Sequence, residues 1–173
     1  MKLRTLSASM MLASAGLMAQ PASANISDNV IRIGFITDMA SVYSDIDGAG
    51  GIEAARMAIA DAGGEINGKK IELVFADHQN KADVAAARAR EWFDQQKIDM
   101  LIGGTNSGVN LALAGIAAER KKPFFAIGAA ASDLTGSQCT PYTVHWAYDT
   151  VALARGTGSA VVKAGGKSWY FLT

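Results

Sequence analysis

Cysteine and histidine are scarce in this sequence of 173 residues. Cys139 is the only cysteine, and His78 and His145 are the only histidines. One cysteine allows no disulfide within the chain and no thiolate-based zinc site, so Cys139 is either a buried apolar side chain or the partner of a thiol outside this sequence. The histidines are far apart and lack carboxylates at ligand spacing. We therefore expect no metal and no other cofactor, and we interpret Asp77 and His78 as polar loop groups.

An excess of positive charge is also absent. The chain has 16 basic and 16 acidic residues. Two of the basic residues, Lys2 and Arg4, lie in the first 24 residues, which hold no acidic residue, so 16 − 2 = 14 basic residues face 16 acidic ones in the remainder. A net charge near −2 gives no basic surface for nucleic acid.

Long apolar runs are missing too, apart from a short one near the start. Residues 1–24 combine that basic start with a short Leu, Met and Ala stretch and the small residues Ala22-Ser23-Ala24. This pattern is typical of a secretory signal peptide cut after Ala24. No later stretch approaches the roughly 20 apolar residues of a membrane span. We expect a soluble protein exported to the periplasm, without a cysteine-linked lipid anchor.

Strand and helix patterns alternate along the rest of the chain. Apolar runs predict strands over residues 30–37, 70–76, 100–103, 124–127, 143–146 and 168–172. Helical periodicity predicts helices over residues 50–62, 81–96, 107–120 and 149–164, the last interrupted by Gly156 and Gly158. Asn67-Gly68 predicts a tight turn. Alternation with short connections predicts an α/β fold, a parallel sheet flanked by helices.

A ligand crevice is expected at the carboxyl edge of this sheet. If the second strand lies outside the first and the third lies on its other side, the crevice opens between the first and third strands. The loop bearing Tyr43 then approaches Ser107, and the loop 128–133 lies beside them. Asp77 and His78 should lie further out.

The stretch 101–110, Leu-Ile-Gly-Gly-Thr-Asn-Ser-Gly-Val-Asn, is the centre of this predicted site. A helix start offers unpaired N–H groups and partial positive charge to an anion such as a carboxylate. We interpret Ser107 as the centre of the ligand site. The alternative is that Asn106 or Ser107 is simply an N-cap.

Other glycine-rich and serine motifs do not match enzymes. Residues 48–53 fail the dinucleotide fingerprint because Glu53 replaces the third glycine, and residues 103–108 lack the Lys-Ser/Thr of a phosphate loop. Residues 104–108 are not a nucleophile elbow, because the serine is one place late. A hydrolase would need His145 to activate Ser107. We therefore expect a binding protein rather than an enzyme, with a serine hydrolase as the weak alternative.

Several stretches together resemble ABC-transporter substrate-binding proteins of the branched-chain amino acid type. The resemblance lies in residues 31–45 (IRIGFITDMASVYSD), 51–60 (GIEAARMAIA), 101–107 (LIGGTNS), 127–135 (IGAAASDLT) and 143–146 (TVHW). It covers essentially the whole chain after residue 24.

The resemblance implies roles for four residues. Ser107 matches the serine that binds the ligand carboxylate, and Ala130 and Ser132 match the loop that offers backbone groups and a hydroxyl to the same ligand. Tyr43 matches an aromatic residue of the pocket wall. From position alone, Tyr43 could instead be a surface aromatic, and Ser132 could begin a simple turn. Ser132 also departs from the threonine of leucine-type receptors, which leaves the ligand's identity open.

The family implies a two-lobed monomeric receptor that closes on a small ligand and passes it to the permease of an ABC importer. We expect an amino acid or a related carboxylate or amide. Residues 25–142 would form the N-terminal lobe, and residues 143–173 would form the crossover and the beginning of a second lobe, so we expect a fragment or a truncated product of such a receptor. The ligand-sensing lobe of an amide- or urea-responsive regulator is the other interpretation.

Overall fold

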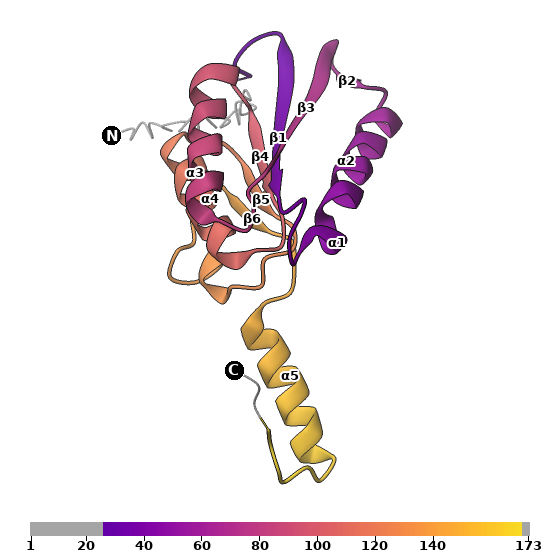
Figure 1. Ribbon diagram of the computed structural model, residues 1–173, viewed down its shortest axis with the longest axis vertical. Helices are drawn as coiled ribbons and strands as arrows, with labels where there is room; N and C mark the ends of the chain where they lie inside the picture. Colours follow the sequence, from indigo (N-terminus) through magenta and orange to yellow (C-terminus); the bar gives the residue numbers. More distant parts are fainter. Residues whose placement is uncertain (1–25, 171–173) are drawn as a thin grey trace, which may run out of the picture.

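The computed structural model describes residues 26–170, so the predicted signal peptide 1–24 lies outside the described residues. One six-stranded sheet forms the centre of the molecule (Figure 1), in the order β2-β3-β1-β4-β5-β6. The strands are β1 Val30–Thr37, β2 Glu65–Ile66, β3 Lys69–Asp77, β4 Met100–Gly103, β5 Phe124–Ala126 and β6 Thr143–His145. All neighbours pair in parallel except β2 with β3. The predicted fold class is confirmed, as is the placement of β3 and β4 on either side of β1.

Helices cover both faces of the sheet. They are α1 Ser44–Asp47, α2 Ala49–Asp61, α3 Ala82–Glu91, α4 Ser107–Glu119 and α5 Thr150–Lys163, with a π-helical turn at Trp92–Gln96 and a 3-10 turn at Ser132–Leu134. α3 and α4 pack side by side on one face, α2 lies on the other, and α5 extends away from the sheet (Figure 1). No helix within residues 26–170 has the length and apolar character needed to cross a bilayer.

Two predictions from the sequence are wrong. α5 is one continuous helix through Gly156 and Gly158, because each glycine stands in open space and keeps helical geometry. Residues 168–170 form no strand, since no neighbouring strand is there to pair with them, and Phe171 and Leu172 lie outside the described residues. Cys139 is exposed, which removes the first of its two interpretations, a buried apolar side chain, and leaves the second open.

The turn at Asn67-Gly68 is confirmed and closes an unpredicted hairpin. Both residues have positive φ, 52° and 75°, which suits a two-residue turn between antiparallel strands. The turn pairs β2 with the first residues of β3. The hairpin adds a short antiparallel edge to an otherwise parallel sheet.

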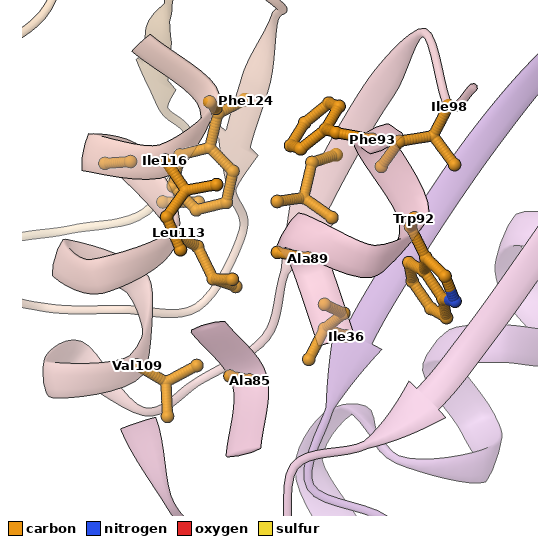
Figure 2. Close-up of a cluster of buried hydrophobic side chains, with 14 of the residues drawn as sticks. Ile36, Ala85, Ala89, Trp92, Phe93, Ile98, Val109, Leu113, Ile116 and Phe124 are labelled. Atoms are coloured by element: carbon orange, nitrogen blue, oxygen red, sulfur yellow. The ribbon is translucent and has the colours of Figure 1, made fainter. Parts of the chain in front are cut away.

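The main hydrophobic core lies between the sheet and the α3–α4 layer. Figure 2 shows that Ala85 and Ala89 of α3 face Val109, Leu113 and Ile116 of α4. Small residues on α3 let the two helices approach closely. The indole of Trp92 needs similar room on the sheet, because a Cβ at Gly34 would lie 2.9 Å from Trp92 Cε3.

The opposite face of the sheet is packed more loosely. Ile52 is the only buried residue of α2. A cavity of about 280 Å³ separates α2 from the sheet, lined by Ile33, Ala55, Ala58, Ile59, Ala62, Ile71, Leu73, Met100 and Ile102. The α3–α4 layer therefore contributes most of the apolar burial that holds the carboxyl edge of the sheet in place.

Candidate functional site

At the carboxyl edge of the sheet, the segments that follow β1 and β4 run to opposite faces. The chain leaves β1 toward α1 and α2 on one face and leaves β4 toward α4 on the other (Figure 1). In parallel α/β sheets, ligands bind at such a switch point, where two loops part in this way. The loop after β5 borders the same edge, because β5 pairs with β4.

Ser107 is the first residue of α4. The N-cap is Asn106, whose side chain accepts a hydrogen bond of 2.8 Å from the Val109 N–H. This leaves Ser107 free of the capping role. Its Oγ accepts a hydrogen bond of 3.2 Å from the Ala130 N–H, so the hydroxyl proton remains available for an acceptor such as a carboxylate oxygen. The N–H groups of Ser107 and Gly108, in the first turn, have no protein acceptor within residues 26–170.

The loop after β5 brings Ala130 and Ser132 to this helix start. The hydrogen bond from Ala130 to Ser107 joins two of the predicted site residues directly. The Ala130 carbonyl accepts from the Thr150 N–H at 2.8 Å, which ties the loop to the start of α5. Ser132 is half-buried and is the first residue of the 3-10 turn. It lies two residues after Ala130, on the same loop.

Tyr43 lies across the crevice edge, on the loop after β1. Its backbone N–H donates to Asp38 Oδ2 at 3.0 Å, and its side chain is half-buried. No hydrogen bond joins Tyr43 to Ser107 in the part of the chain that the structure describes. The structure thus places Tyr43 on the loop expected to face the pocket, without a hydrogen bond to the serine among the described residues.

Asp38 organises the loop that carries Tyr43. The carboxylate is fully buried and accepts four hydrogen bonds, from the Ser41 hydroxyl and from the N–H groups of Ala40, Ser41 and Tyr43. Burial raises the pKa of Asp38, but these hydrogen bonds outweigh it and hold the pKa at about 2. Sequence analysis did not single out Asp38. An aspartate followed at the third position by serine just after a strand is a turn pattern that could have indicated it.

Asp47 joins the end of β1 to the loop after β4. One carboxylate oxygen accepts from Thr37 Oγ1 at 2.8 Å, and the other accepts from Thr105 Oγ1 at 2.7 Å. Glycines leave room for this buried group, because a Cβ at Gly104 or Gly128 would lie 2.7 or 3.3 Å from Asp47 Oδ2. No sequence signal marks Asp47, since its two threonine partners are 10 and 58 residues away.

Asp77 and His78 lie further out along the sheet edge, as predicted, because β3 is on the far side of β1 from β4, but they are more than exposed polar loop groups. His78 is fully buried, and Asp77 Oδ1 accepts from the Met39 N–H at 3.1 Å, which ties the end of β3 to the loop after β1. Burial lowers the pKa of His78, although the carboxylates of Asp38, Asp77 and Asp47 act in the opposite direction. The loop folds inward because its polar groups find partners on neighbouring loops.

The site offers hydrogen-bond donors rather than metal ligands. Within residues 26–170, no group of three or more histidine, cysteine, aspartate or glutamate side chains could hold a metal ion. The carboxylates at the edge, Asp38 and Asp47, are already engaged by protein donors. The remaining hydroxyl and N–H donors at the start of α4 suit an anionic ligand.

The fold, with its crevice at the switch point between β1 and β4, defines the class: it is that of a lobe of the type I periplasmic binding proteins. A sequence profile described as "periplasmic binding protein" matches residues 30–173, and the chain belongs to this family. No curated protein matches the chain significantly.

Solved structures of the same family extend the comparison. A periplasmic binding protein from Burkholderia mallei is 63% identical, with a TM-score of 0.81, over 84% of this chain and 39% of that one. A branched-chain amino acid ABC-transporter periplasmic ligand-binding protein from Burkholderia xenovorans is 37% identical, with a TM-score of 0.73, over 80% and 37%. An ABC-transporter solute-binding protein from R. palustris, solved with benzoate, is 26% identical, with a TM-score of 0.72, over 79% and 38%. The chain thus spans less than two fifths of each relative, and the predicted resemblance to branched-chain amino acid type receptors is confirmed.

Proposed function

We propose that this chain is the N-terminal lobe of a periplasmic solute receptor that binds a small carboxylate, foremost an amino acid, and delivers it to the permease of an ABC importer. The observation that carries the proposal is the Ser107 hydroxyl, which accepts from the Ala130 N–H and keeps its own proton for a ligand. Two relatives support the ligand class, because one is described as a branched-chain amino acid transport protein and another holds benzoate. Both kinds of ligand bear a carboxylate.

Ligand capture in this proposal involves no covalent chemistry. The carboxylate lies against the start of α4, where Ser107 and the first N–H groups donate to it, and Ser132 donates from the loop after β5. Tyr43 forms part of the wall, and the second lobe of a complete receptor closes over the ligand and presents a surface to the permease. The receptor acts as a monomer and needs no cofactor.

A serine hydrolase finds little support in the same geometry. His145 Nε2 lies 2.6 Å from the Ala129 carbonyl oxygen, so the ring is engaged by backbone rather than by Ser107. Ser107 Oγ accepts from the backbone and has no histidine partner among the described residues. We therefore propose a binding protein without enzymatic activity.

Replacing Ser107 by alanine tests the ligand site. NMR titration of the chain with L-isoleucine and, separately, with benzoate gives the Kd even when binding is weak. Loss of a hydrogen bond to a carboxylate should cost about 1.5 to 3 kcal/mol, which corresponds to about a 10- to 150-fold higher Kd. Ser159→Ala, on the exposed surface of α5, is the matched control and should bind as the unmodified chain does. An unchanged Kd in Ser107→Ala would show that the site lies elsewhere.

A further inference from the structure

The turn at residues 77–80 contains two consecutive residues with left-handed backbone conformation that are not glycine. Gln79 and Asn80 have φ values of 52° and 57°. Such conformations are uncommon outside glycine, although asparagine tolerates them better than most residues. They persist where the surrounding structure holds them firmly.

Side chains two positions earlier hold both residues. Asp77 Oδ1 accepts from the Gln79 N–H at 2.7 Å, and His78 Nδ1 accepts from the Asn80 N–H at 2.9 Å. The His78 carbonyl then accepts from the Lys81 N–H at 2.9 Å, just before α3 begins. These two hydrogen bonds, each between a side chain and the backbone N–H two residues later, fix the direction in which the Asn80 side chain leaves the turn.

That side chain reaches the start of α4. Asn80 Oδ1 accepts a hydrogen bond from Asn106 Nδ2. The other side-chain atom of Asn106, Oδ1, accepts from the Val109 N–H and caps the helix. A terminal amide has one acceptor and one donor end, so the contact with Asn80 selects the orientation in which the oxygen faces the helix.

We propose that Asn80, held by His78, is a positioning residue for the ligand site: it orients Asn106 and thereby fixes the first turn of α4, where Ser107 and the neighbouring N–H groups meet the carboxylate. This inference rests on the proposed function of that site. It gives the buried His78 a part in ligand binding without contact to the ligand. The 77–80 turn also holds the opposite wall, because Asp77 Oδ1 accepts from the Met39 N–H.

Three variants test the proposal. Asn80→Gly keeps the left-handed backbone accessible and removes the side-chain acceptor, whereas Asn80→Asp keeps an acceptor oxygen of the same reach. Asn67→Gly is the matched control, because Asn67 is also left-handed, with φ 52°, but lies in the β2–β3 turn away from the crevice. Two readouts are measured for each: the Kd for benzoate by NMR titration, and the hydrogen exchange rate of the Val109 amide without ligand.

Asn80→Gly should raise the Kd about fivefold, the change expected when a helix cap is weakened, and should speed exchange at Val109 severalfold. Asn80→Asp should restore both values, and Asn67→Gly should change neither. The proposal is overturned if Asn80→Gly leaves Val109 exchange unchanged, or if Asn67→Gly reproduces its effects. If Ser107→Ala binds benzoate normally, the proposed ligand site fails, and exchange at Val109 still decides whether Asn80 orients the helix start.

Discussion

At the scale of single residues, the buried imidazole of His78 makes the fold sensitive to acid. Its Nδ1 accepts from the Asn80 N–H, so the neutral ring carries its proton on Nε2, and within residues 26–170 that nitrogen has no hydrogen-bond partner. Burial lowers the pKa of His78 from its ordinary value of 6.5. Between that lowered pKa and pH 6.5, the unfolded chain therefore binds more protons at this site than the folded chain does.

The free energy of unfolding should consequently fall as the pH drops below 6.5. The fall should occur between pH 6.5 and the lowered pKa of His78 in the folded chain, with a slope of at most about 1.4 kcal/mol per pH unit for this single group. Urea unfolding at several pH values measures it. His78→Asn should flatten the profile in this window, whereas His145→Asn keeps His78 and should retain the slope. A profile that is flat in the unmodified chain would contradict the prediction.

The site residues that could be predicted from the sequence are those whose position follows from their own strand and loop. The residues that could not be predicted have roles that depend on partners distant in the sequence. Ser107 and Ala130 could be placed at one edge because each follows a strand of a parallel sheet, and they are hydrogen bonded to each other. Asp47 and His78 could not be recognised, because their roles depend on partners from other loops. Local pattern indicates where a loop begins, but not which side chains of neighbouring loops it will meet.

At the scale of elements, the glycines of β4 and α4 have opposite requirements. Gly115, in the middle of α4, has open space where a Cβ would be. A Cβ at Gly103, the last residue of β4, would lie 2.9 Å from Phe124 Cζ and against the side-chain oxygen of Asn110. Gly115 therefore lowers the stability of the helix, whereas Gly103 is required for the close contact between α4 and the sheet.

Alanine substitutions at these two positions should therefore change stability in opposite directions. Gly115→Ala should raise the free energy of unfolding by about 0.5 to 1 kcal/mol, because it restricts the unfolded chain and suits a helix. Gly103→Ala should lower it by about 1 to 3 kcal/mol through overpacking. Denaturant unfolding measures both. Equal effects at the two sites would mean that the packing around Gly103 is not as tight as the structure shows.

Element boundaries were predictable where apolar pattern and burial agree. β1 and β4 begin and end as predicted, because both are central strands with runs of apolar residues. The glycines of α5 predicted an interruption, yet the helix continues through Gly156 and Gly158, where a Cβ would meet only open space. The strand predicted over residues 168–172 depended on a neighbouring strand for pairing, which a sequence pattern does not supply.

At the scale of the whole molecule, α5 is attached to the sheet without being part of its core. It contains no buried residue, and it meets the lobe through the hydrogen bond from the Thr150 N–H to the Ala130 carbonyl. Several of its apolar side chains are exposed, including Val151, Leu153, Val161 and Val162. The cooperative unit is therefore the sheet with α1 to α4.

A chain shortened to end at Thr150 should unfold at the same temperature as the full chain. It retains the contact with Ala130 and loses only surface that is exposed in the structure. Differential scanning calorimetry measures the midpoint, and far-UV circular dichroism should show the loss of one helix. A clear fall in the midpoint would mean that α5 stabilises the lobe.

The carboxylate of Asp47 also limits how the crevice can change during evolution or design. Asp47 accepts hydrogen bonds from Thr37 and Thr105 and leaves no room for a side chain at Gly104. The residues at these four positions therefore form one interdependent unit, although they come from distant parts of the sequence. A substitution at one of them leaves a buried group unpaired or overcrowded until a second substitution follows. Under the proposed function, new ligand preferences are thus reached more easily through Tyr43 and Ser132, neither of which is hydrogen bonded to Asp47 in the described part of the chain.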